Sequence, residues 1–156
     1  MFYPTRYGQN KNFPSPEKFE IRYLGEHVGK GVVCVCSFKK GDLVAEITGD
    51  IFRKKMLHTL QISTTEHLLD RYFSGYFLHS CNPNVSVSMQ DLVVRALCDL
   101  HINDILYIDY AETEDVLFRQ FECRCDSQNC RGWITGRKEG IMEYDYATFS
   151  SYSSSI

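Results

Sequence analysis

Three cysteines lie close together in the segment FECRCDSQNC, where Cys123, Cys125 and Cys130 form a C-x-C-x4-C pattern. Thiolates at this spacing can converge on one soft divalent cation, about 2.3 Å from each sulfur in a tetrahedral zinc site. A closed site needs a fourth ligand, which one of the other four cysteines or a histidine can supply. On its own, the pattern is equally compatible with reactive or buried free thiols.

The chain has seven cysteines, and an odd number cannot all pair within one chain. We therefore expect a reducing compartment. Cys34 and Cys36 alternate along an apparent strand, and Cys98 ends an apolar run. We expect these three to be packed core thiols.

Three further segments precede the cysteine cluster. They are Gly29-Lys30-Gly31, then His79-Ser80-Cys81-Asn82-Pro83-Asn84, then a stretch that ends in Asp109-Tyr110. Alone, each is weak, because a G-x-G is usually a turn and an Asp-Tyr pair usually ends a strand. A single tyrosine among ten is also more often structural than catalytic.

In this order, and with Cys130-Arg131-Gly132 at the end, the segments resemble the SET-domain protein lysine methyltransferases, including their cysteine-bearing post-SET segment. The resemblance spans Gly29 to Ile134. It implies small sheets of short strands around a pseudoknot, followed by a zinc-binding post-SET segment. The implied boundaries are an N-terminal arm over 1–18, a SET domain over 19–118, a post-SET segment over 119–137 and a C-terminal tail over 138–156.

The local patterns agree with a mostly β fold that has little helix. Apolar and β-branched runs predict strands over 31–36, 43–51, 85–89, 92–97 and 105–108, and 53–61 favours one short helix. Three of the four prolines lie in the first 18 residues, which predicts an extended arm. The tail from Ala147 contains five serines, and we expect it to be mobile.

The resemblance also implies how S-adenosylmethionine binds. The backbone of Gly29, Lys30 and Gly31 would contact its methionine part, and the main chain of His79 would contact the adenine. Leu78 occupies a cofactor-binding position where the family usually has asparagine. Trp133, the only tryptophan, would cover the cofactor, although an ordinary core or lid aromatic is an equal alternative.

The same comparison assigns Cys81 as the fourth zinc ligand, with Cys123, Cys125 and Cys130. With four thiolates the coordination is closed, so the expected role of zinc is structural, with no open position to activate water.

Tyr110 matches the catalytic tyrosine of the family, and Ile47, Ile108 and Tyr110 would line the channel for the substrate lysine. Ile47 replaces a tyrosine and Ile108 an aromatic residue that limits methylation, so the sequence favours di- or trimethylation. Gly75 stands where the family often has arginine.

The substrate amine must lose a proton before it can attack a methyl group, because an ammonium with a pKa of about 10.4 has no lone pair. A narrow apolar channel beside a sulfonium would depress that pKa. The sequence offers no obvious carboxylate base.

Charge disfavours a nucleic-acid binder, since 17 Lys and Arg stand against 20 Asp and Glu. Between Asp104 and Asp126, seven acids stand against two arginines, which could attract a lysine-rich peptide or form a solvated acidic loop. A zinc-ribbon nucleic-acid protein is disfavoured for the same reason, and because only one cysteine cluster is present. No apolar run approaches the roughly 20 residues that cross a bilayer.

The sequence therefore predicts an S-adenosylmethionine-dependent protein lysine N-methyltransferase, with a histone tail as the first candidate substrate. The alternative is a non-catalytic SET-like module that binds a lysine-rich peptide or the cofactor. The N-terminus lacks a secretory apolar region, which favours a cytoplasmic or nuclear location. The small size is also compatible with a microbial or viral protein that acts on host chromatin.

Overall fold

The structure is a computed structural model, and it describes residues 2–142. This part of the chain contains twelve strands, which form five small sheets, and three helical turns. The strands are β1 (Phe19–Tyr23), β2 (Lys30–Cys34), β3 (Leu43–Glu46), β4 (Asp50–Phe52), β5 (Thr59–Gln61), β6 (His67–Leu69), β7 (Leu78–His79), β8 (Val85–Ser88), β9 (Val93–Ala96), β10 (Tyr107–Ile108), β11 (Phe121–Glu122) and β12 (Trp133–Ile134). The helical turns are η1 (Thr5–Tyr7), η2 (Ser74–Tyr76) and the four-residue α1 (Tyr110–Thr113). The mostly β prediction with little helix is confirmed.

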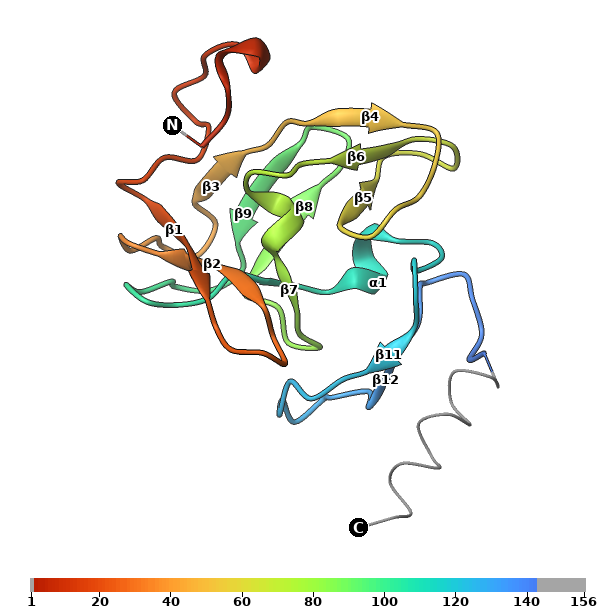
Figure 1. Cartoon of the computed structure of the whole chain (residues 1–156). Coiled ribbons are helices and arrows are strands. Elements are labelled where there is room, and N and C mark those ends of the chain that lie inside the picture. The colour runs from red at the N-terminus through yellow and green to blue at the C-terminus, as the bar shows by residue number, and fades with distance from the viewer. Residues whose placement is uncertain (1, 143–156) are drawn as a thin grey trace.

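Figure 1 shows how the sheets surround the middle of the chain. β1 and β2 form an antiparallel pair, and β3-β9-β8 and β4-β6-β5 form two three-stranded sheets. β7 pairs in parallel with β10, and β11 pairs with β12 below α1. None of the helices within residues 2–142 has the length and apolar character needed to cross a membrane.

One large apolar core joins these sheets. Its fully buried side chains include Phe19, Val32, Phe73, Val94 and Leu106. A second, smaller cluster contains Cys81, Leu117, Cys123 and Ile134 and lies where the β11-β12 pair meets the rest of the chain. Burial of this kind supplies roughly 25 cal/mol for each Å² of apolar surface, so the larger core carries most of the stability.

The prediction of one strand over 43–51 is wrong, because the chain bends after Glu46 and forms β3 and β4 in two different sheets. Gly49 lies at this bend, where an added Cβ would approach the Leu69 carbonyl oxygen to 2.5 Å. Only glycine fits there without movement of the backbone.

The predicted helix over 53–61 is also absent. His58 has a φ of 69°, a left-handed conformation that ends any right-handed helix, and Thr59–Gln61 pairs with β6 as a strand. Pairing with a neighbouring strand thus overrides the helical spacing of the apolar residues in this segment.

The cysteine predictions outside the cluster hold in part. Cys34 is 1% exposed and Cys36 is half-buried against the main core, as expected for packed thiols. Cys98 is exposed, so its prediction as a core thiol is wrong. It follows β9 at the point where the chain turns away from the sheet, so the apolar run that it ends does not continue into the core.

The N-terminal arm contains no α-helix, as predicted, but it is extended only in part, because turns over 11–12 and 16–18 accompany η1; it packs on the core. Tyr3 is 3% exposed, and its hydroxyl donates a 2.6 Å hydrogen bond to Asp70 Oδ2. Asp70 is itself 1% exposed and accepts three backbone N–H groups and the Ser74 hydroxyl. The predicted mobile tail from Ala147 lies outside the described residues.

We expect Tyr3→Phe to lower the free energy of unfolding by about 1.5–3 kcal/mol, because it removes a buried hydrogen bond to a charged group. Urea denaturation followed by circular dichroism would measure this loss. Tyr7→Phe is the matched control, since the Tyr7 hydroxyl bonds the partly exposed Asp50. Equal losses in the two variants would contradict a structural role for the Tyr3-Asp70 bond.

Candidate active site and metal centre

The parallel pairing of β7 and β10 brings two distant segments of the chain together. Tyr107 lies opposite Leu78, and Ile108 lies opposite His79. Asn84 holds the pair from the side, because its amide nitrogen donates to Ile105 O at 2.8 Å and its amide oxygen accepts Tyr107 N–H at 2.8 Å. This pairing places the histidine of one segment beside the tyrosine that follows the other.

Tyr110 begins α1, directly after Asp109, whose carboxylate caps the helix by accepting Ala111 N–H at 3.0 Å. The Tyr110 hydroxyl donates a 2.8 Å hydrogen bond to Phe77 O. Burial, with a smaller effect from the Glu114 carboxylate, raises the pKa of Tyr110 to about 12. The phenol therefore stays protonated at neutral pH, with its hydrogen committed to Phe77 and its oxygen lone pairs free to accept.

A cavity of about 480 Å³ opens beside the Tyr110 side chain. Phe77, Ile108 and Tyr110 line this cavity, together with residues 55–60 and 117–121. Ile108 and Tyr110, two of the three predicted channel residues, therefore share this cavity. Ile47, the third, is 3% exposed in the main core and is not among the residues that line the cavity.

The Gly29-Lys30-Gly31 segment forms the turn into β2 and approaches β7. A Cβ at Gly31 would lie 2.7 Å from the Leu24 side chain and 3.2 Å from that of Leu78. Gly29 has a φ of 78° and open space on its Cβ side, so its backbone can face a ligand. The structure thus brings the G-x-G turn close to Leu78, the residue next to His79.

Gly75 has a structural reason to differ from the arginine that is common in similar sequences. A Cβ at this position would lie 2.4 Å from the Asp70 carbonyl oxygen, so no larger residue fits this backbone. Gly75 lines the cavity near Ser74 and Phe77. The close approach of the Asp70 backbone carbonyl therefore restricts this position to glycine.

The four predicted metal ligands lie together, although Cys81 is separated in sequence from the other three. The sulfur atoms of Cys81, Cys123, Cys125 and Cys130 all lie within 4.8 Å of one another, and Cys81 and Cys123 are 3.8 Å apart. A tetrahedron with zinc-sulfur bonds of 2.3 Å has edges of about 3.8 Å, so this donor set fits a zinc ion. Arg131 N–H and the Ser127 hydroxyl lie within hydrogen-bonding distance of the Cys81 and Cys125 sulfurs, at 3.4 and 3.0 Å.

The thiols of this cluster differ in how readily they ionise. Burial and the neighbouring thiols raise the pKa of Cys123 well above its ordinary value. Burial also opposes ionisation of Cys125, but hydrogen bonds from Ser127 and from backbone groups outweigh it and lower its pKa to about 5. Four adjacent thiolates repel one another unless a cation lies between them, so the cluster is suited to a divalent metal.

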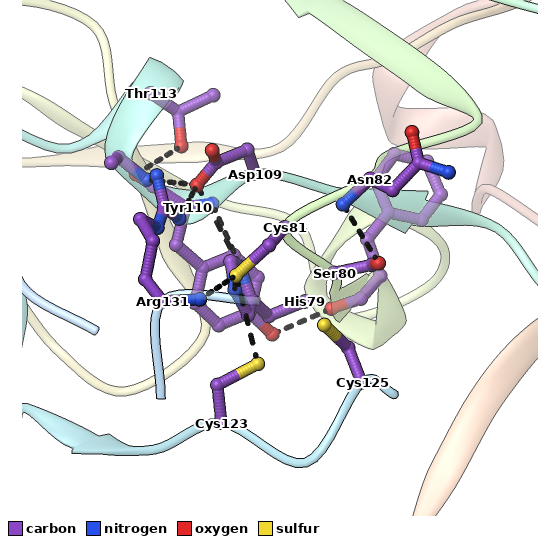
Figure 2. Close-up of polar contacts among 12 residues, drawn as sticks. His79, Ser80, Cys81, Asn82, Asp109, Tyr110, Thr113, Cys123, Cys125 and Arg131 are labelled. Atoms are coloured by element: carbon purple, nitrogen blue, oxygen red, sulfur yellow. Dashed lines mark hydrogen bonds and ion pairs between the residues drawn. The ribbon is translucent and has the colours of Figure 1, made fainter. Parts of the chain in front are cut away.

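Figure 2 shows that polar contacts connect the cysteine cluster to Tyr110. The Arg131 guanidinium lies 2.6 Å from Asp109 Oδ1, while its backbone N–H faces Cys81. The buried His79 ring makes a second connection, since Nδ1 accepts Tyr110 N–H at 3.2 Å and Nε2 lies 3.5 Å from the Cys81 sulfur. Burial lowers the pKa of His79 to about 4, which keeps the ring neutral and able to accept.

Sequence reasoning did not find these roles for the side chains of His79, Asp109 and Arg131. Arg131 lies in the Cys-Arg-Gly motif and Asp109 in the Asp-Tyr motif, but a pairing across 22 residues leaves no periodic signal in the sequence. The ion pair requires the β11-β12 unit to pack under α1, which only the folded chain shows.

Trp133 lies in β12 opposite Glu122 of β11. Its indole N–H donates to Gln120 Oε1 at 2.9 Å. Trp133 is not among the residues that line the cavity, whereas its neighbours in space, Gln120 and Phe121, are. The indole thus supports the wall of the cavity from behind.

Three of the seven acids between Asp104 and Asp126 form ion pairs with nearby lysines or arginines. Arg131 pairs with Asp109, Arg137 and Lys138 pair with Asp115, and Arg124 pairs with Glu122. These contacts favour local charge compensation over a free acidic surface.

Comparisons with known proteins agree with this geometry. No protein-family model matches the chain. The chain is 38% identical over 103 residues to "Methyltransferase flvH" of Aspergillus flavus, covering 64% of this chain and 57% of that protein. It is 29% identical over 86 residues to "Histone-lysine N-methyltransferase, H3 lysine-9 specific" of Schizosaccharomyces pombe, covering 40% of this chain and 18% of that protein.

Among solved structures, KRYPTONITE in complex with mCHG DNA and SAH matches with a TM-score of 0.59 and 25% identity, over 74% of this chain and 28% of that one. A second KRYPTONITE structure, with mCHH DNA, H3(1-15) peptide and SAH, matches at 22% identity with the same TM-score of 0.59, over 74% of this chain and 29% of that one. The chain therefore spans little more than half of one curated relative and less than a third of the other proteins compared here.

Proposed function

We propose that this chain transfers a methyl group from S-adenosylmethionine to the side-chain amine of a lysine. The reason is that it belongs to the SET-domain protein lysine methyltransferases with a cysteine-containing post-SET segment. One observation carries the proposal. The phenol of Tyr110 lies between a cavity that can admit a side chain and the β7 segment that resembles the cofactor motif of the family.

The residues present fit the methyl donor. Gly29, Lys30 and Gly31 offer backbone groups at an open turn, and the side chain of Leu78, the residue before His79, lies next to it. We assign Trp133 to the post-SET wall that closes over this region. S-adenosylmethionine, when bound, supplies an electrophilic methyl group on a positively charged sulfur.

Tyr110 would align the substrate nitrogen. Its hydroxyl hydrogen is held by Phe77 O, so its oxygen can accept a hydrogen bond from the amine and hold it in line for attack. The nitrogen lone pair would form the new N–C bond, and the electron pair of the C–S bond that breaks would stay on the sulfur. Orientation of this kind can contribute about 7–11 kcal/mol to catalysis.

We propose that zinc occupies the four-cysteine cluster and has a structural role. It would tie the 119–137 segment to Cys81 and so hold Phe121 against Tyr110 and His79, with ring centroids 5.9 and 5.6 Å apart.

We propose a histone tail as the substrate. We propose accordingly that the protein acts in the nucleus or cytoplasm, or on the chromatin of a host cell. The support is the printed names of the relatives, one of them specific for H3 lysine-9, and a neighbour solved with an H3(1-15) peptide.

The test is incubation of the purified chain with methyl-labelled S-adenosylmethionine and a histone mixture or whole lysate, followed by mass spectrometry. Methylated lysine is the expected product. Cofactor binding without transfer to any protein would favour the non-catalytic SET-like module instead.

The degree of methylation gives a further prediction. Ile108 is 2% exposed and lines the cavity, and its side chain has no hydroxyl that could hold a water or restrict a methylated amine. We expect wild type to produce di- and trimethyl-lysine, and Ile108→Phe to stop mainly at monomethyl-lysine, because the larger ring narrows the cavity. Ile108→Leu conserves volume and is the control. An unchanged product distribution in Ile108→Phe, measured by mass spectrometry, would contradict the assignment.

A further inference from the structure

The cavity contains one acidic side chain. Among its lining residues within the described part of the chain, Glu114 is the only aspartate or glutamate. It follows α1 one helical turn after Tyr110, and its backbone N–H donates to Tyr110 O at 2.9 Å. Residues one helical turn apart lie on the same side, and Tyr110 and Glu114 both line the cavity.

Glu114 is buried, at 6% exposure, and held in place. Its Oε1 accepts the backbone N–H of Gln61 in β5 at 2.8 Å, and the Thr113 hydroxyl gives further support. A carboxylate can accept about four hydrogen bonds, so capacity remains toward the cavity. A buried carboxylate is costly unless it has a partner, which makes its position beside the phenol informative.

Two cations act on Glu114 from nearby, Lys55 and Arg137, and both donate hydrogen bonds to other groups; Arg119 is a further cation that lines the cavity. The Lys55 ammonium donates to Val116 O and Leu117 O at 2.9 and 2.7 Å, and Arg137 pairs with Asp115. None of the ion pairs found within residues 2–142 involves Glu114. A cationic group that enters the cavity would therefore find this carboxylate available.

Tyr110 cannot fill the same role. Its hydroxyl is protonated at neutral pH and already donates to Phe77 O. It can accept a hydrogen bond and align an amine, but it has no ionised form near pH 7 that could remove a proton.

We infer that the Glu114 carboxylate binds the ammonium group of the target lysine and accepts one of its protons. The inference rests on the proposed function and names a residue for the step that the sequence left without one. One N–H bond of the ammonium breaks, its electron pair stays on nitrogen as the lone pair, and the proton forms an O–H bond on Glu114. The proton then leaves to water through the cavity.

Binding can be tested without turnover. Carboxyl ¹³C NMR of glutamate-labelled protein, titrated with n-butylammonium chloride, should shift the Glu114 signal, identified by its loss in Glu114→Gln. The Glu112 signal should stay, since this exposed carboxyl lies on the same short helix. The uncharged probe n-butanol should shift neither. A site built for this cation should bind it well below about 100 mM. If the Glu114 signal does not shift with up to about 100 mM n-butylammonium, the inference is overturned.

Activity gives the second readout. At pH 8 only about 0.4% of a lysine amine with pKa about 10.4 is neutral, so loss of the proton acceptor should lower kcat in Glu114→Gln by about 10²-fold. Glu112→Gln removes the same charge from the same helix and should stay within about twofold of wild type.

The pH profile separates proton transfer from a general structural effect. The rate of Glu114→Gln should rise about tenfold per pH unit between pH 7 and 9, as the neutral amine fraction grows, while wild type changes little. The charged or titratable groups near Glu114 are Lys55 from the loop before β5, Arg137 after β12 and Tyr110 on α1, and His58 and Arg119 also line the cavity. Parallel profiles for the two proteins would overturn the proton-accepting role.

Stability provides the folding control. Burial raises the pKa of Glu114, so the protonated carboxyl stabilises the fold. This contribution is complete below the ordinary pKa of a glutamate and is lost as the pH rises through the raised pKa of Glu114. Glutamine is neutral at all pH values, and we expect the melting temperature of Glu114→Gln at pH 7.5 to equal or exceed that of wild type. An active wild type without the NMR response contradicts this inference alone. The NMR response without any methyl transfer contradicts the proposed function alone.

Discussion

Replacing Tyr110 with phenylalanine is expected to lower kcat for methyl transfer by about 10²–10³-fold, the usual effect of removing one preorganised hydrogen-bonding group at a reacting centre. Tyr110 lines the cavity, and its hydroxyl hydrogen is directed to Phe77 O. Its loss removes the acceptor that would align the substrate nitrogen. Cofactor affinity should change little, because no contact of the phenol involves the Gly29–Gly31 turn.

Stability should fall by only about 1 kcal/mol in this variant, since one neutral hydrogen bond is lost and the ring stays in place. The measurement is single-turnover methyl transfer, together with calorimetric binding of S-adenosylhomocysteine. Tyr72→Phe is the matched control, because Tyr72 is a partly buried tyrosine that packs against Tyr3 and Tyr7 and does not line the cavity. A Tyr110→Phe protein with wild-type kcat would remove Tyr110 from the mechanism.

The sequence predicted those strands whose apolar residues follow a local pattern. The alternation over Val85 to Met89 and the apolar run over 92–97 both form strands, β8 and β9, which pair with each other. Their side chains face the core on one side only, and this produces the period of two in the sequence. Prediction was poorer at Gly49 and His58, where contacts with distant backbone decide the conformation.

The candidate site follows the same division. The family resemblance placed Tyr110, His79 and the four cysteines in one site, and the structure brings them together. Glu114 carries no motif, and in the sequence it is one of seven acids in an acidic stretch. Its distinction is burial beside Tyr110, because Asp115 next to it is paired with Arg137 and Lys138.

The structure places Ile47 and Trp133 differently from what the resemblance implies. Both occupy positions that the resemblance assigns to the site, yet Ile47 packs in the main core and Trp133 bonds Gln120 behind the cavity wall.

Removal of the metal from the cysteine cluster is expected to abolish activity while leaving most of the fold intact. β11 and β12 contain two residues each, and an isolated pair of strands is at best marginally stable in water. The small apolar cluster beneath them includes Cys81 and Cys123 themselves, so little else holds the segment. Zinc binding contributes about 10–16 kcal/mol in small zinc domains at pH 7, which is enough to decide whether such a segment folds.

The main core contains none of the four cluster cysteines, so the β1–β9 sheets should survive chelation. We expect a strong zinc chelator to remove one zinc per chain, to abolish methyl transfer and to expose the 119–137 segment to trypsin at Arg124 and Arg131, with little change in far-UV circular dichroism. Cys123→Ser should reproduce these effects, and Cys98→Ser, which alters an exposed thiol outside the cluster, should not.

The reason for the loss of activity is geometric. Phe121 packs against both His79 and Tyr110, and Arg131 holds the Asp109 cap at the start of α1 through a 2.6 Å ion pair. Release of the segment removes one wall of the cavity and the support for the helix that carries Tyr110 and leads to Glu114. Partial activity should return on adding zinc back above pH 7, and less at pH 5, where protons compete for the thiolates. A metal-free protein that stays active and resists trypsin would show that packing alone holds the segment.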